Sequence, residues 1–180
     1  NFLSFKTVQF DLTGEGVTLI EGKNLDSTAA ESNGSGKSAL VSIVSWALYG
    51  TTHRGAKLSD VLSDTTNSKE VSATIHFRKN DTDYQVERRY TKKGGTLVFK
   101  VNTIDRSSHK IADTQAQIEQ ALGFSETDFC QMVYLDLNRR FGSLSDSQKK
   151  EFIENIIDMP AFSNAESAVS DDIEAETKEY

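Results

Sequence analysis

The chain has 180 residues, of which 37% are hydrophobic and 26% are charged, and its formal net charge is −7 at pH 7. No apolar run approaches the ~20 residues that span a bilayer, so we expect no membrane partner. The negative charge argues against a protein that coats nucleic acid over its whole surface, although it leaves room for local basic patches. A single cysteine, Cys130, cannot form an internal disulfide. It fits a cytoplasmic protein and predicts a buried small side chain.

The first elements in chain order are a short buried strand at Val17–Ile20, ending at Gly22, and a polar stretch from Lys23 to Ser32. Apolar residues then recur at helical spacing, which predicts a helix after Ser38 that ends at Gly50. These apolar residues are Leu40, Ile43, Val44, Ala47 and Leu48. The order strand, glycine-rich turn, helix is the setting of a phosphate-binding loop.

That turn reads Asn33-Gly34-Ser35-Gly36-Lys37-Ser38. Its glycines let backbone N–H groups face a phosphate, and the helix dipole places positive potential there. Lys37 is predicted to reach the β- and γ-phosphates, and the Ser38 hydroxyl to bind Mg²⁺. The sequence therefore predicts a site for a nucleoside triphosphate with Mg²⁺. The predicted nucleotide contacts are Asn33, Gly34, Ser35, Gly36, Lys37, Ser38 and Ala39.

The loop departs from the usual G-x-x-x-x-G-K-[ST] pattern at its first position, where Glu31 replaces glycine. Gly22 is the nearest earlier glycine and lies at the end of the predicted strand. We interpret residues 23–32 as an insertion that leaves the phosphate-contacting half of the loop intact.

Three alternating segments follow, at residues 71–78, 83–90 and 97–101, with Asn80–Asp81 and Gly94–Gly95 between them. These turn residues tolerate the backbone angles of tight hairpins, so we predict a three-stranded antiparallel meander. A helix over Ile111–Leu122 is predicted to end at Gly123.

The last part of the chain predicts a short strand at Met132–Leu135 and a helix that Ser145 and Gln148 open and Pro160 ends. Ser163 and Glu166 form a second capping pair. The acidic tail after it is either the start of a coiled coil or a frayed surface helix.

Basic residues occur in pairs on the predicted meander, at Arg88–Arg89 and Lys92–Lys93. We predict these four as candidates for DNA contact, against the alternative of solvated surface charge. Arg54, after the predicted P-loop helix, either approaches the nucleotide or DNA or belongs to a plain surface loop. His53 and Lys57 share that interpretation.

An ordered set of motifs resembles the N-terminal lobe of SbcC-type ATPases, the SMC-like, ABC-class enzymes of DNA double-strand-break repair. The set is Asn1-Phe2 with Ser4-Phe5, Leu19–Gly22, Asn33–Ser38, Trp46–Gly50, Phe129, and the helix Ser145–Asp158 with Phe162. Phage recombination-endonuclease subunits belong to the same group. The resemblance implies an α/β fold, with residues 1–162 as the ATPase lobe and residues 163–180 as the start of the coiled coil.

The resemblance further implies that ATP is the nucleotide and that a C-terminal lobe of the same protein completes the site. No L-S-G-G-type signature, and no apolar run followed by Asp-Glu, occurs in this sequence. The implied partners are a second copy engaged through the ATPase heads, a nuclease subunit and double-stranded DNA ends, in the cytoplasm (the host's, for a phage protein). The family's γ-phosphate-sensing glutamine is replaced by Leu137, which leaves Asn138 as the nearest amide.

Two other interpretations remain open. Met132–Asp136 also resembles a Walker B strand, in which case Asp136 holds Mg²⁺ and the chain is a self-contained P-loop NTPase. The third interpretation is a nucleotide-gated DNA tether, whose output is shape and whose hydrolysis only resets it.

Overall fold

The computed structural model describes residues 1–14, 16–24, 35–52, 54–56, 58–62, 69–134 and 141–156. The chain divides into two compact units, Asn1–Gly123 and Phe124–Tyr180. No helix in the described ranges is long and apolar enough to cross a bilayer. The predicted boundary between lobe and coiled coil, at residues 162 and 163, lies outside these ranges.

The first unit is built on an antiparallel sheet with the strand order β1-β2-β3-β4. Its strands are β1 (Glu70–Lys79), β2 (Thr82–Thr91), β3 (Gly94–Val101) and β4 (Ile104–Asp105). The predicted meander is confirmed, and β4 extends it by one short strand. Asn80 and Asp81 close the first hairpin with φ angles of 49° and 59°, the left-handed region that these two residue types tolerate.

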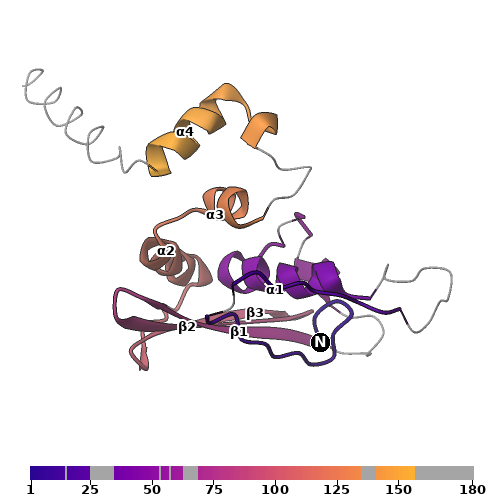
Figure 1. The fold of residues 1–180 in the computed structure, drawn as a ribbon. Coiled ribbons are helices and arrows are strands. Elements are labelled where there is room, and N and C mark those ends of the chain that lie inside the picture. Colours follow the sequence, from indigo (N-terminus) through magenta and orange to yellow (C-terminus); the bar gives the residue numbers. More distant parts are fainter. Residues whose placement is uncertain are drawn as a thin grey trace, which may run out of the picture. The chain divides into compact units, whose positions relative to one another are not determined.

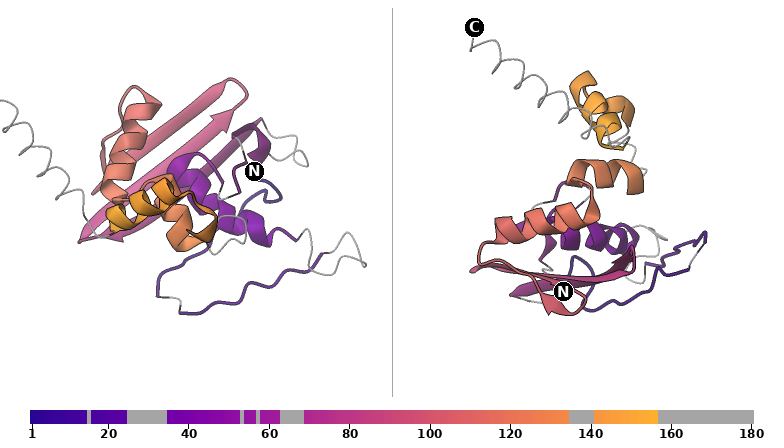
Figure 2. Two further views of the ribbon diagram at one scale, coloured as in Figure 1. Left: turned by 90° about the horizontal axis from the view of Figure 1, so that it is seen from above. Right: turned by 90° about the vertical axis from the view of Figure 1, so that its left-hand side faces the viewer.

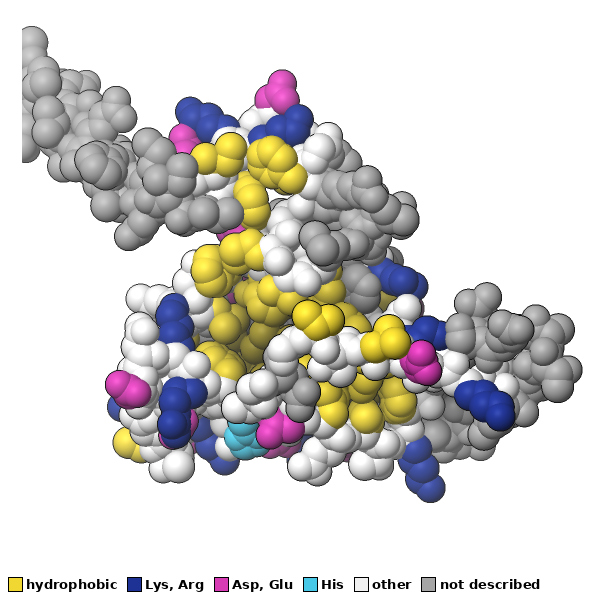
Figure 3. Space-filling model, in the orientation of Figure 1, with side chains coloured by type: hydrophobic (Ala, Val, Ile, Leu, Met, Phe, Trp, Pro, Cys, Tyr) yellow, Lys and Arg dark blue, Asp and Glu magenta, His cyan; other side chains and the backbone are white. Residues whose placement is uncertain are grey.

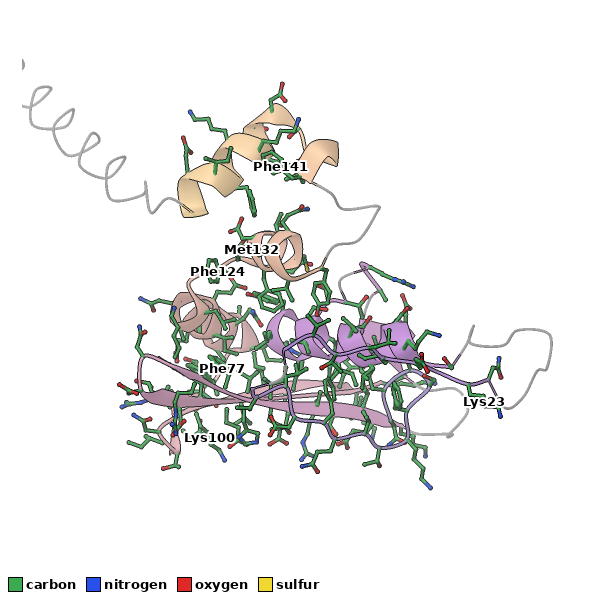
Figure 4. The ribbon with its side chains drawn as sticks, viewed as in Figure 1. Lys23, Phe77, Lys100, Phe124, Met132 and Phe141 are labelled. Atoms are coloured by element: carbon green, nitrogen blue, oxygen red, sulfur yellow. The ribbon has the colours of Figure 1, made fainter. Side chains whose placement is uncertain are left out.

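Two helices, α1 (Lys37–Tyr49) and α2 (Ile111–Leu122), lie on one face of this sheet (Figure 1; Figure 2, left). Alternation along the strands decides which side chains they cover, since Val71 is buried while Ser72 is exposed. Figure 4 shows Phe77 on the helix-facing side and Lys100 on the opposite side. The core beneath α1 consists of Phe2, Trp46, Ala47, Val61, Val71 and Ala73.

Both predicted helix ends are confirmed. Gly50 follows α1 with φ 80°, and its N–H donates to Trp46 O at 2.8 Å. Gly123 follows α2 in the same way, with φ 81° and a 2.8 Å bond to Glu119 O. A glycine closes each helix because the left-handed conformation strains residues that carry a Cβ. A short 3₁₀ turn, η1 (Leu58–Val61), lies between α1 and β1.

The strand predicted at Val17–Ile20 is wrong, because these residues are described and none is in a strand. Val17 is 105% exposed and Leu19 is 80% exposed. At the start of the chain, Phe2 forms isolated bridges with Phe5 and Leu62. Figure 2 shows this part of the chain as an extended trace outside the sheet and its helices. Apolar content alone does not make a strand, and this segment is not one of the four strands of the described sheet.

The second unit contains α3 (Glu126–Val133), a short 3₁₀ turn η3 (Phe141–Ser143) and α4 (Asp146–Ile156). The predicted opening of α4 is confirmed, since Ser145 N–H donates to Gln148 Oε1 at 3.0 Å. Phe141 and Phe152 pack together with ring centroids 5.6 Å apart. The features predicted beyond residue 156, from Pro160 to the coiled coil, lie outside the described residues.

The strand predicted at Met132–Leu135 is wrong at Met132 and Val133, which belong to α3. The helix prevails because Ser125 caps it: the Asp128 N–H donates to Ser125 Oγ at 3.2 Å, and the Asp128 carboxylate accepts from Ser125 N–H. This reciprocal pair satisfies N–H groups that a helix start would leave unbonded. The predicted burial of Cys130 is confirmed at 2% exposure.

Candidate nucleotide-binding site

The described part of the loop, Ser35–Ser38, runs directly into α1, which begins at Lys37. Gly36 precedes the helix with φ 90°. A Cβ at this position would lie 2.7 Å from Ser4 Oγ and 3.1 Å from the Phe5 ring. Both the backbone angle and the close approach of the N-terminal segment therefore require glycine at position 36.

Gly22 packs against the same loop. A Cβ on Gly22 would lie 2.7 Å from Ser35 Cβ and 3.1 Å from Lys37 Cγ. The two ends of the intervening stretch therefore adjoin, as expected for an insertion that leaves the loop and returns to it. Most of the insertion, including Glu31, lies outside the described residues, and so do Asn33 and Gly34 of the loop.

The start of α1 fits a phosphate group. Gly36 provides no side-chain cap, and the first helical turn contains no acidic residue. An N-terminus of this kind carries positive potential and N–H groups that an anion can accept. The ammonium of Lys37 donates to Ser35 Oγ at 3.2 Å, which keeps it beside the loop. Ala39 is buried, so its side chain packs inside while its backbone belongs to the first turn.

The Ser38 hydroxyl is exposed and accepts a hydrogen bond from Arg54 Nη2 at 3.2 Å. A serine hydroxyl at this position of a P-loop is the oxygen that ligates Mg²⁺. Of the two interpretations of Arg54, the structure favours the approach to the nucleotide site, because its guanidinium touches this oxygen. The other two residues of that group, His53 and Lys57, lie outside the described residues.

Asp136, Leu137 and Asn138 also lie outside the described residues, so their positions relative to the loop stay predictions. The described residues contain no group of three or more His, Cys, Asp or Glu side chains that could hold a separate metal ion.

The burial of Arg88 counts against its predicted DNA contact. Its side chain is on the inner face of β2, where the residue is only 6% exposed. Its guanidinium donates to the carbonyl oxygens of Ala47 and Leu48 at 3.0 and 3.2 Å, and also to Gln115 Oε1. Burial lowers the pKa of Arg88 to about 10, which leaves the group charged at neutral pH. Arg88 thus satisfies carbonyls at the C-terminal end of α1 and is not part of a DNA-facing surface.

The other three candidates are exposed. Arg89 forms ion pairs with Glu87 at 2.6 Å and with Glu70 at 3.1 Å, and these pairs raise its pKa. Lys92 and Lys93 lie in the turn between β2 and β3. On the face seen in Figure 3, the Lys and Arg side chains are scattered among acidic ones. The three residues remain a candidate DNA surface of modest charge.

A glycine-rich turn that leads into an uncapped helix, with lysine and serine at its first two positions, is the arrangement of P-loop nucleotide-binding proteins. A family model described as an AAA domain matches residues 1–180, so the chain belongs to that family. Among curated proteins it is similar to a "Probable exonuclease subunit 2" of Escherichia phage T5, at 24% identity over 98% of this chain. It is also similar to an "Exonuclease subunit 2" of Enterobacteria phage T4, at 27% identity over 79% of this chain.

A further relative is a "DNA double-strand break repair Rad50 ATPase" of Halobacterium salinarum, at 30% identity over 67% of this chain. These matches confirm the relationship to SbcC- and Rad50-like ATPases, including phage members. The chain spans 29%, 24% and 13% of the length of the T5, T4 and Halobacterium proteins.

Proposed function

We propose that this chain is the ATP-binding lobe of an SMC-like DNA repair or recombination ATPase that acts with a nuclease subunit on DNA ends. The observation that carries the proposal is the convergence of Gly22, Gly36, Lys37 and Ser38 at the start of α1. Mg²⁺ bound with the nucleotide would neutralise phosphate charge during transfer to water. Ser38 is the residue that would hold the ion, and Lys37 would hold the terminal phosphates.

A second lobe of the same protein completes the ATPase in this proposal. Apolar side chains along the N-terminal segment face solvent, which suits a segment that is covered in the assembled protein. They are Val8, Phe10, Leu12, Val17, Leu19 and Ile20. The self-contained alternative needs a strand before Asp136, whereas Met132 and Val133 are helical. We therefore favour the two-lobed ATPase.

In the assembled protein, two heads bind MgATP between them and ATP binding couples head engagement to the nuclease subunit and to DNA. The support is the printed descriptions of the relatives, which name exonuclease subunits and a double-strand-break repair ATPase. Arg89, Lys92 and Lys93 are the DNA contacts proposed within this lobe.

The binding step is tested with Lys37→Ala, assayed by equilibrium titration with a fluorescent ATP analogue in the presence of Mg²⁺. Removal of the ammonium should abolish detectable binding, because the bound phosphates lose their main positively charged partner. Lys92→Ala is the matched control, since it removes one lysine from an exposed turn. Wild-type affinity in the Lys37 variant would refute the assignment.

A further inference from the structure

The chain returns from the far end of α1 to the start of that helix. After Gly50 a turn brings it back, with Gly55 N–H donating to Thr52 O at 2.7 Å and Ala56 N–H donating to Thr52 Oγ1 at 2.9 Å. Thr52 is only 2% exposed, so the turn is anchored in the interior. Arg54 lies within this anchored turn, and its contact with Ser38 Oγ joins residues 16 positions apart.

The atom that Arg54 contacts is the one that Mg²⁺ would need. A magnesium ligand oxygen lies about 2.1 Å from the metal, and an octahedral ion tolerates little deviation from that geometry. The guanidinium is permanently charged and approaches the same oxygen to 3.2 Å. Two cations bound to one hydroxyl oxygen repel each other, and solvent at this exposed contact weakens the repulsion. Arg54 and Mg²⁺ therefore compete for Ser38.

We propose that Arg54 guards the magnesium position: its guanidinium competes with Mg²⁺ for Ser38 Oγ, and MgATP binding displaces it. The inference rests on the proposed function, because it takes Ser38 as the magnesium ligand. Arg54 then sets the magnesium concentration at which the lobe binds nucleotide. The turn that carries Arg54 is fixed at Thr52, so displacement moves the side chain and leaves the turn in place.

The guard role and a supporting role predict opposite results. If Arg54 only positioned Ser38 or attracted phosphate, its removal would raise the magnesium requirement. If Arg54 excludes the ion, its removal lowers that requirement. The effect should be modest, since an exposed contact of this kind corresponds to about a twofold to fivefold change in an equilibrium constant.

The test uses the full-length protein with a non-hydrolysable ATP analogue at fixed concentration and a titration with MgCl₂. Arg54→Ala should reach half-maximal nucleotide binding at about twofold to fivefold less Mg²⁺ than wild type. Arg54→Lys should fall between the two, because lysine keeps the charge without the planar donor fork. Arg106→Ala is the charge-matched control: this exposed arginine follows β4, and its removal should leave the midpoint unchanged.

An unchanged or higher magnesium midpoint in Arg54→Ala would overturn the guard role. If the wild-type protein still binds nucleotide and Lys37→Ala abolishes that binding, the proposed nucleotide site is retained. A downward shift of equal size in Arg106→Ala would also overturn it, because general charge would then explain the effect. Absence of nucleotide binding by the wild-type protein would overturn the proposed function, and the guard role with it.

Discussion

At the scale of single residues, Arg88 shows how a charge can serve the fold. The same alternation that puts Val86 and Tyr90 on the inner face of β2 puts Arg88 there too. The sequence pattern predicted the alternation. We nevertheless interpreted Arg88 together with Arg89 as a basic pair that contacts DNA. Its three acceptors come from α1 and α2, and their proximity depends on tertiary packing that no local pattern encodes.

We predict that Arg88→Ala lowers the free energy of unfolding by about 2–4 kcal/mol, because it removes a buried charged donor from the Ala47 and Leu48 carbonyls and from Gln115. Urea denaturation of the purified protein measures this loss. Arg89→Ala is the adjacent control and should cost far less, since its ion pairs are exposed. Equal losses in the two variants would mean that the buried contacts of Arg88 add little stability.

Among the structural elements, the phosphate loop depends on two glycines that are distant in the sequence. Gly22 and Gly36 let neighbouring segments pack closely against the loop. The sequence identified both positions, since Gly36 belongs to the motif and Gly22 was proposed as the end of the preceding segment. The predicted strand in that segment, at Val17–Ile20, is wrong. A strand at Val17–Ile20 requires pairing, and hydrophobic content alone cannot show whether a partner strand is present.

The capping of α3 is a second case at this scale. Apolar residues at Met132 and Val133 suggested a strand, yet the reciprocal bonds of Ser125 and Asp128 start a helix that includes them. The signal was in the sequence, since Ser and Asp three residues apart resemble a capping box. A short apolar run does not distinguish a strand from a helix by its periodicity.

Because Gly22 packs closely against the phosphate loop, we predict that Gly22→Ala disrupts this packing. The added Cβ would meet Ser35 Cβ at 2.7 Å, and rotation of the Ser35 side chain cannot relieve that overlap. We expect a stability cost of about 1–3 kcal/mol together with weaker binding of MgATP.

Gly16→Ala is the matched control for this change, because nothing lies within 4 Å of a Cβ at Gly16. Thermal unfolding and nucleotide titration of both variants would decide the matter. Wild-type binding and stability in Gly22→Ala would contradict the close packing of Gly22 on the loop.

At the scale of the whole molecule, the described fold is a sheet covered by two helices in its first unit, with a separate helical second unit. The family relationship was predictable from the ordered motifs, because Leu19–Gly22, the P-loop and Trp46–Gly50 follow one another in the expected order. The positions of Asp136 and Asn138 relative to the loop stay predictions. In our proposal, the exposed apolar side chains from Val8 to Ile20 form a surface that a second lobe covers.

In the proposed function, this lobe needs a second lobe of the same protein to hydrolyse ATP. The most direct measurement is steady-state ATP hydrolysis by this chain alone and after addition of the separately expressed C-terminal segment of its gene. We predict no hydrolysis by the chain alone, and activity on mixing that Lys37→Ala abolishes. Robust hydrolysis by the chain alone would contradict the two-lobed architecture and favour a self-contained P-loop NTPase with Asp136 at the magnesium site.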